Sequence, residues 1–156
     1  MSETLLVSGA GANQIGIFLK ASAMGIETVA ADGDPQASGL RHADAQEIID
    51  ILDPEALVQA ATKHSADAIY PAAELSVEAV ATAAARLGLP GLPPEAAHRA
   101  RNKFEMRKAL DRAGVPNAKY RLVHSAEESR DAAEALGFPI IVKPVDANSS
   151  KGVLRV

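Results

Sequence analysis

The sequence predicts an α/β protein built on a doubly wound, mostly parallel sheet. Two observations carry this prediction. Over residues 1–90, short apolar runs alternate with segments of helical periodicity, and turn residues separate the two kinds of segment. Apolar runs without polar alternation, such as Leu5–Val7, are typical of strands that are buried on both faces. Strands of this kind that alternate with helices predict parallel pairing, with helices on both sides of the sheet.

The elements of this first part follow one another regularly. Strands are predicted over residues 5–8, 27–31, 47–51 and 68–70, and helices over 13–24, 53–64 and 76–87. Gly9, Gly25, Pro71 and Gly88 end segments, because glycine permits conformations that other residues avoid and proline cannot extend a strand or helix freely. In Asp53-Pro54 the carboxylate caps the free amides of a helix and the proline occupies a position that needs no amide.

The pattern changes at Leu89–Pro94, where three prolines and one glycine occur in six residues. This is the best candidate boundary, and it predicts domains over 1–90 and 91–156. The second domain is predicted to contain helices over 95–101, 103–113 and 125–136 and strands over 120–123, 138–143 and 153–156. Ser125 with Glu128 forms a capping box. A strand that begins only at residue 153 is expected to have lost its hairpin partner, so the sequence is expected to be a fragment of a longer protein.

Composition excludes several classes of function. Lys and Arg number 16 against 20 Asp and Glu, which gives a formal net charge of -4 and argues against nucleic-acid binding. There is no cysteine, so disulfides, thiolate metal sites and thiol nucleophiles are excluded. No apolar run approaches the roughly 20 residues that span a membrane. The expected location is the cytoplasm.

The segment Gly9–Gly16 joins the first strand to the first helix. Its glycines allow a tight turn and close approach of the backbone, and a helix N-terminus favours an anion. A dinucleotide fingerprint requires glycine where this sequence has Gln14. Three interpretations stay open: NAD or NADP binding with Asp32 or Asp34 on the ribose, a structural turn, and a loop that lines a substrate site. In the last case Gly9, Gly11 and Asn13 are the candidate residues.

Glu74 follows the fourth strand, at the carboxyl edge where open parallel sheets bind ligands. It is a candidate to hold an ammonium or hydroxyl group of a substrate. The alternative is that Glu74 only begins the next helix.

Two lysines are candidate phosphate ligands. Lys143 ends the apolar run Phe138–Val142, where its charge would cost desolvation unless it met an anion. Lys103 opens the helix before Gly114-Val115-Pro116 and, taken alone, is a surface lysine. The small polar loop 146–152 offers amides and hydroxyls, with Ser149, Ser150 and Gly152 as candidates, or forms an ordinary hairpin turn. The lysines are 40 residues apart, so only the fold can bring them together.

The order of these motifs resembles the ATP-grasp superfamily. The Gly-rich turn is similar to that of carbamoyl-phosphate synthase large chains, and Gly-Phe-Pro-Ile-Ile-Val-Lys-Pro after Ala-Gly-Val-Pro is the more specific match. The resemblance implies a Rossmann-like preATP-grasp domain followed by the incomplete first lobe of an ATP-grasp α+β domain. It also implies an ATP-dependent ligase that joins a carboxylate to an amine or thiol through an acylphosphate.

The resemblance also implies roles for residues. Lys103, Lys143, Ser149, Ser150 and Gly152 would bind ATP, and a small carboxylate would be the second partner. Mg²⁺ ligands are expected downstream, so no metal or catalytic residue is assigned within the chain, and the fragment is expected to be inactive. Many relatives dimerise, which makes a homodimer possible. Ala147 and Ser149 replace glycines that the family's loop usually carries, which predicts a stiffer loop.

Two other classes of function remain. A dinucleotide-binding oxidoreductase or sensor module would use the Gly9–Gly16 turn with Asp32 or Asp34. A non-catalytic interaction domain would carry degenerate nucleotide loops. The four histidines show no spacing typical of metal ligands, and no hydrolase triad is recognisable.

Overall fold

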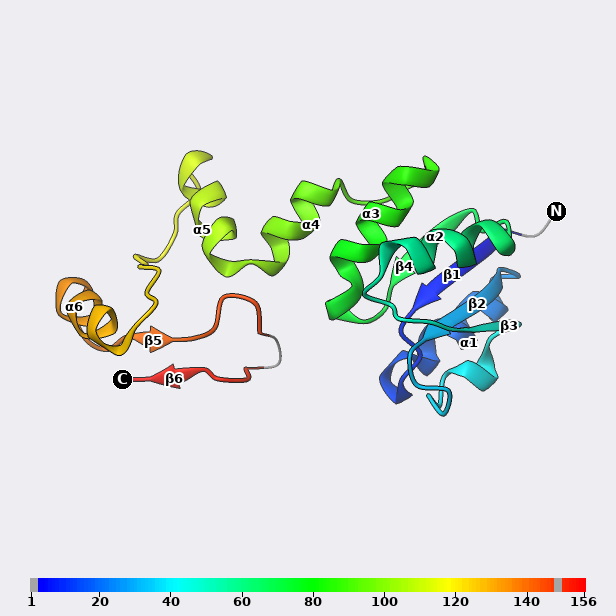
Figure 1. The fold of residues 1–156 in the computed structure, drawn as a ribbon, viewed down its shortest axis with the longest axis horizontal. Coiled ribbons are helices and arrows are strands. Elements are labelled where there is room, and N and C mark those ends of the chain that lie inside the picture. The colour runs from blue at the N-terminus through cyan, green and yellow to red at the C-terminus, as the bar shows by residue number, and fades with distance from the viewer. Residues whose placement is uncertain (1–2, 148–149) are drawn as a thin grey trace. The chain divides into compact units, whose positions relative to one another are not determined.

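The computed structural model describes residues 3–147 and 150–156 and divides into two compact units, Met1–Ala97 and His98–Val156. The first unit contains a four-stranded sheet made of β1 (Thr4–Ser8), β2 (Glu27–Asp32), β3 (Ala45–Ile48) and β4 (Ala68–Pro71). The strand order is β3-β2-β1-β4, and each of the three neighbouring pairs is parallel. The predicted α/β class is therefore confirmed (Figure 1).

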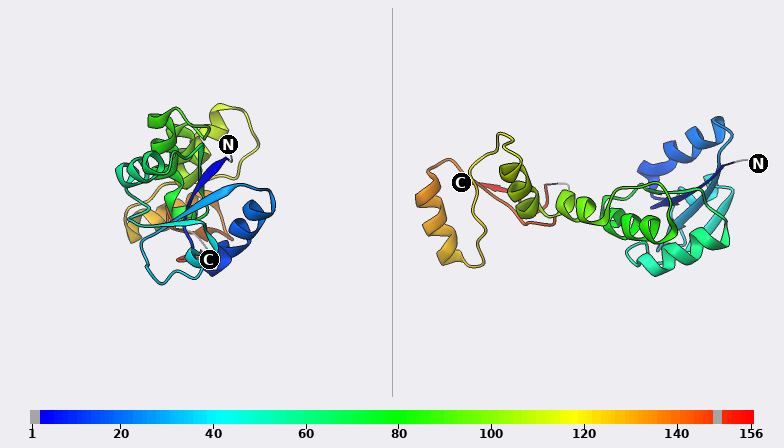
Figure 2. Two further views of the ribbon diagram at one scale, coloured as in Figure 1. Left: turned by 90° about the vertical axis from the view of Figure 1, so that its right-hand side faces the viewer. Right: turned by 90° about the horizontal axis from the view of Figure 1, so that it is seen from above.

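Successive strand residues point to opposite sides of the sheet, so apolar side chains lie on both faces and helices cover both. On one face, Leu6 and Val29 lie in a core cluster with Leu57 of α2 (Pro54–Lys63) and Val80 of α3 (Val77–Leu87). On the other face, Val7 and Ala30 pack with Phe18 of α1 (Ile15–Ala23). The views in Figure 2 show α1 and the α2–α3 pair on opposite sides of the sheet. The doubly wound arrangement follows from this alternation.

Alanine dominates the buried apolar positions. Of the 21 apolar side chains that are buried in the described residues, 13 are alanine. Small side chains let a helix lie close to the sheet, and alanine also favours the helical backbone itself. These 13 of the 32 alanines in the sequence therefore have a packing role in addition to any compositional bias.

The third strand lies earlier than predicted. It was expected over 47–51, but β3 is Ala45–Ile48 and pairs with Val29–Asp32 of β2. The chain turns directly after it, where the Asp50 carboxylate accepts the Leu52 amide at 2.9 Å. The isoleucines at 49 and 51 are apolar because they pack beside the core, not because they extend the strand.

The second unit is built from short elements. Helix α4 (Pro94–Arg101) crosses the division between the units, and α5 (Lys103–Arg112), α6 (Ala126–Leu136), β5 (Ile141–Val142) and β6 (Leu154–Arg155) follow. The predicted caps are confirmed: Asp53 caps α2, and Ser125 accepts the Glu128 amide at 3.1 Å to cap α6. No helix in the described part of the chain has the length and apolar character needed to cross a bilayer.

Two expectations for the second unit are wrong. Residues 120–123 form no strand; the Tyr120 hydroxyl instead donates to Asp111 of α5 at 2.6 Å. The last strand does have a hairpin partner, since β6 pairs antiparallel with β5 in the register Ile141 to Arg155. Both predictions failed because strand pairing depends on residues distant in sequence, which an apolar run alone does not reveal.

Candidate functional site

The first turn of unit 1 is fixed by close packing at Gly9. Its φ is +102°, and a Cβ built there would lie 2.7 Å from the Cβ of Ala73. Gly9 also donates its amide to the Ala31 carbonyl at 2.8 Å. The turn therefore needs glycine at position 9 for backbone conformation and for contact with the segment that follows β4.

The two aspartates at the end of β2, Asp32 in the strand and Asp34 just after it, bind nearby backbone amides. Asp32 accepts the Ala10 amide at 2.7 Å and the Asp34 amide at 3.0 Å, and Asp34 accepts the Gln36 amide at 2.9 Å. Asp32 thus ties the glycine turn to the end of the second strand. This structural role weakens the dinucleotide interpretation, in which one of these carboxylates binds a ribose.

The other candidate substrate residues lie at the carboxyl edge of the sheet. Asn13 belongs to η1 (Ala12–Gln14) and Glu74 to η3 (Glu74–Ser76), and both residues are exposed, whereas Gly11 is half-buried. Gln14 connects the two loops by donating to the Ala72 carbonyl at 3.3 Å. The loops after β1 and β4 are therefore adjacent, and their role in substrate binding stays a prediction.

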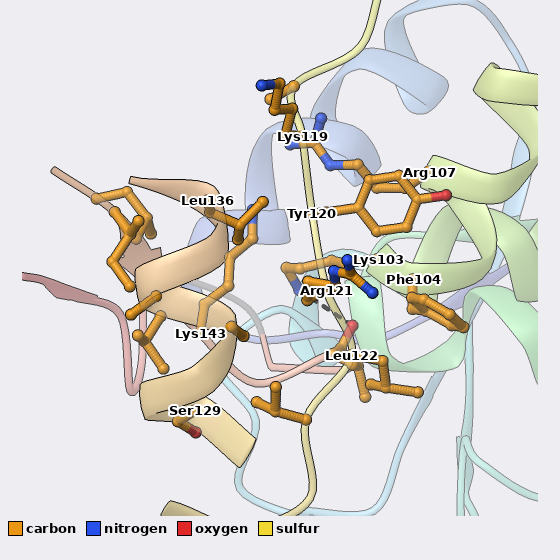
Figure 3. A pocket seen from close by; sticks show the side chains of 18 of the residues that line it. Lys103, Phe104, Arg107, Lys119, Tyr120, Arg121, Leu122, Ser129, Leu136 and Lys143 are labelled. Carbon is orange, nitrogen blue, oxygen red and sulfur yellow. Dashed lines mark hydrogen bonds between the residues drawn. The ribbon is translucent and has the colours of Figure 1, made fainter. Parts of the chain in front are cut away.

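A cavity of about 500 Å³ lies within the second unit (Figure 3). It is formed by α5, the segment 118–123, α6 and the strand that leads to Lys143. Its cationic lining residues are Lys103, Arg107, Lys119, Arg121 and Lys143. No aspartate, glutamate or histidine is among the lining residues in the part of the chain described. Because no acidic residue is among the lining residues described, the concentrated positive charge favours an anionic ligand.

The structure brings the two predicted lysines to this one cavity, although they are in different environments. Lys143 is exposed, so the predicted desolvation of its ammonium is wrong. Lys103 is half-buried, and its ammonium donates to the carbonyls of Ala147 at 2.5 Å and Val145 at 3.5 Å. Phosphate binding by either lysine stays a prediction.

Sequence reasoning missed Arg107 as a site residue. It lies four residues after Lys103 in α5, and residues at this spacing share one face of a helix. The spacing of four residues between Lys103 and Arg107 within a predicted helix is the signal in the sequence that could have identified it. The Arg107 guanidinium donates to Asn117, whose amide group donates in turn to the Arg107 carbonyl at 3.1 Å and to Asp111 at 3.0 Å.

A hydrogen-bonded cluster fixes one wall of the cavity. The hydrogen bond from Tyr120, together with that from Asn117, holds the pKa of Asp111 below its ordinary value of 3.8. The same Asp111 carboxylate raises the pKa of the Tyr120 hydroxyl above 10.0. The Tyr120 ring packs edge-to-face on Phe104, with centroids 5.8 Å apart. These contacts attach the segment around Tyr120 to α5.

The predicted loop is only partly described. Ser149 lies outside the described residues. Ser150 has a φ of 59°, in the left-handed region that non-glycine residues adopt at a cost of roughly 1–2 kcal/mol. Gly152 has a φ of 70°, and a Cβ there would lie 2.9 Å from Cγ of Pro144. Neither residue is among those that line the cavity.

The two units carry opposite net charge. Residues 98–156 contain 12 Lys and Arg against 7 Asp and Glu, a net charge of +5. Residues 1–97 contain 4 against 13, a net charge of -9. The overall value of -4 therefore conceals a basic unit, which is the one that contains the cavity.

No group of three or more His, Asp or Glu side chains gathers within 3–147 and 150–156.

Sequence comparison finds relatives along almost the whole chain. A formate-dependent phosphoribosylglycinamide formyltransferase of Methanocaldococcus jannaschii is 32% identical over 153 residues, which cover 97% of this chain and 39% of that protein. The protein with the same name from Bacillus velezensis is 30% identical over 161 residues, which cover 97% and 40%. The chain thus spans about two fifths of the length of these relatives. No family model matches.

Solved structures agree with this relationship. Phosphoribosylglycinamide synthetase from Anaerococcus prevotii has a TM-score of 0.75 and 30% identity, over 94% of this chain and 38% of that one. N5-carboxyaminoimidazole synthetase from Staphylococcus aureus, solved with ADP, has a TM-score of 0.84 over 99% and 42%, and at 22% identity it shows the shared fold.

Proposed function

This chain is a homologue of ATP-grasp enzymes, and from that premise we propose that it is part of an ATP-dependent ligase. In this proposal, residues 98–156 bind the phosphates of ATP, and residues 1–97 contribute to the site of the carboxylate or its acceptor. The relatives support the proposal because they include a formate-dependent phosphoribosylglycinamide formyltransferase and a phosphoribosylglycinamide synthetase. The observation that carries it is the cavity with five cationic and no acidic lining residues in the part described.

The cavity fits a polyphosphate better than a neutral ligand. Arg107 offers a planar fork of donors, one of which already binds Asn117. Lys143 offers a compact charge with no hydrogen bond to another described side chain or backbone group. Phosphoryl transfer requires mainly positioning and neutralisation of charge, which such cations supply. Phe104, Tyr120 and Leu122 add apolar and aromatic surface to the wall.

The proposed reaction has two steps. A carboxylate oxygen attacks the γ-phosphorus of ATP, and the bond between that phosphorus and the oxygen that bridges it to the β-phosphate breaks. An acylphosphate forms and ADP leaves. An amine or similar nucleophile then attacks the acyl carbon, and inorganic phosphate leaves. The cationic side chains of the cavity would hold the phosphate oxygens and stabilise the charge that develops on them. Mg²⁺, when bound, would neutralise further charge on those oxygens.

The first unit is proposed to bind a substrate group at its sheet edge. Glu74 is exposed beside the turn of Gly9, Gly11 and Asn13, and its negative charge favours a positively charged or hydrogen-donating group. The net charge of -9 on residues 1–97 supports this choice. Participation of Ser150, Gly152 and Ser149 in ATP binding, a cytoplasmic location and a homodimer remain predictions.

Ligand-dependent thermal unfolding tests this function against the dinucleotide alternative. We expect millimolar ATP with Mg²⁺ to raise the melting temperature of the chain, since a ligand that binds only the folded state stabilises it. NAD and NADP at equal concentration are expected to have no effect. Stabilisation by NAD or NADP without stabilisation by ATP would instead favour the oxidoreductase or sensor interpretation.

A further inference from the structure

We infer that Lys103 is a positioning residue, whose ammonium holds the backbone of residues 145–147 against the start of α5. Only one part of this inference rests on the proposed function, namely that the segment held by Lys103 belongs to the ATP site. The two lysines of the cavity have different surroundings. The side chain of Lys143 is exposed, whereas the Lys103 ammonium is half-buried and already bonded to protein.

The contacts converge on three consecutive carbonyls. The Lys103 ammonium donates to the carbonyls of Ala147 at 2.5 Å and Val145 at 3.5 Å, and its own amide donates to Val145 at 2.9 Å. Arg101 donates to the carbonyl of Asp146 at 3.4 Å. Two basic residues at the junction of α4 and α5 thus bind the backbone more than 40 residues away.

Local structure places Lys103 for this role. Asn102 caps α5 by accepting the amides of Phe104 and Glu105 at 3.1 Å each, so the first turn of the helix is fixed. Lys103 is the first residue of that turn. A hydrogen bond from a charged donor is stronger than a neutral one, and an ammonium has three donors. Two bonds to carbonyls leave one N–H for an anion in the cavity.

The consequence is that Lys103 orders this part of the wall before any ligand binds. The segment it holds leads directly from Lys143 and Pro144, which line the cavity. Loss of the Lys103 ammonium should therefore loosen the backbone beside Lys143 as well as removing one positive charge. Loss of the Lys143 ammonium should remove charge and leave the backbone ordered.

Backbone order parameters from ¹⁵N relaxation, recorded without nucleotide, test this role. In the unaltered chain we expect the amides of Asp146 and Ala147 to have values near 0.85, and in Lys103→Met values below about 0.6. Lys103→Arg should restore the order, because its guanidinium also donates to carbonyls. Lys143→Met should leave these amides as ordered as in the unaltered chain.

Two outcomes would overturn the inference: unchanged order in Lys103→Met, or an equal loss of order in Lys143→Met. Because no nucleotide is present, either result is independent of whether the chain binds ATP. If Lys103→Met fails to fold, the unaltered chain still decides the question. In the unaltered chain we expect a scalar coupling across the hydrogen bond, between Nζ of Lys103 and the carbonyl carbon of Ala147. If the Lys103 ammonium signal is resolved and shows no such coupling, the inference is contradicted.

ATP affinity separates positioning from a purely structural role. Lys103→Arg should recover the ATP affinity that Lys103→Met loses, when all three proteins are measured at a temperature at which they are folded. Recovery of backbone order by Lys103→Arg without recovery of affinity would show that the contact to residues 145–147 has no bearing on the ligand site.

Discussion

The Lys143→Met chain is expected to bind ATP roughly ten- to a hundredfold more weakly than the unaltered chain. Lys143 is exposed at the cavity, so its ammonium is available to a phosphate, and a hydrogen bond to a charged group contributes about 1.5–3 kcal/mol. Stability without ligand should change little, because the side chain is exposed. Isothermal titration calorimetry at fixed ionic strength measures both affinities.

Lys20→Met is the matched control for this prediction. Lys20 is also an exposed lysine, but it lies on α1 of the first unit, so this variant removes the same charge away from the cavity. Its affinity for ATP should equal that of the unaltered chain within about twofold. Equal weakening by Lys20→Met and Lys143→Met would mean that net charge, not the cavity, determines binding.

The Gly9→Ala substitution should lower the free energy of unfolding of the first unit by about 3 kcal/mol. A non-glycine residue resists the positive φ of +102°, and the new Cβ would lie 2.7 Å from Cβ and 3.0 Å from the backbone nitrogen of Ala73. That neighbour cannot move without displacing the loop that carries Glu74. Urea unfolding followed by circular dichroism measures the loss.

Gly25→Ala separates the two contributions. Gly25 also has a positive φ, +75°, but nothing lies within 4 Å of a Cβ built there. Its substitution should therefore cost only the conformational part, about 1 kcal/mol. If Gly9→Ala and Gly25→Ala destabilise the protein equally, the close approach between the loops after β1 and β4 is not what requires glycine at position 9.

Local chemistry made most of the helices predictable from the sequence. Asp53-Pro54 and Ser125 with Glu128 identify helix starts because the capping groups lie within three residues of the amides they bind. The buried strands of the sheet were recognisable because a strand covered on both faces needs a continuous apolar run. The predicted parallel order of the strands also placed the turn at Gly9 and the loop of Glu74 at the carboxyl edge of the sheet.

Interactions between residues distant in sequence account for the features that the sequence did not predict. The third strand begins at Ala45 because it pairs with β2, and the neighbouring isoleucines gave a misleading apolar signal. Residues 120–123 have the composition of a strand, yet the Tyr120 hydroxyl attaches this segment to Asp111 of α5, and Asn117, three residues earlier, binds the same carboxylate. The carbonyl contacts of Lys103 also join segments over 40 residues apart, which sequence spacing could not reveal.

Mapping of the ATP site by NMR tests the central claim most directly. The ¹⁵N-labelled chain would be titrated with ATP and Mg²⁺, and the change in each amide signal would be followed to saturation. The proposal predicts saturable changes at Lys103, Arg107 and Lys143 and along 119–122, with the Gly9–Gly16 turn unaffected. Changes confined to that turn and to Asp32 and Asp34, or none at millimolar ATP, would contradict a phosphate site in the second unit.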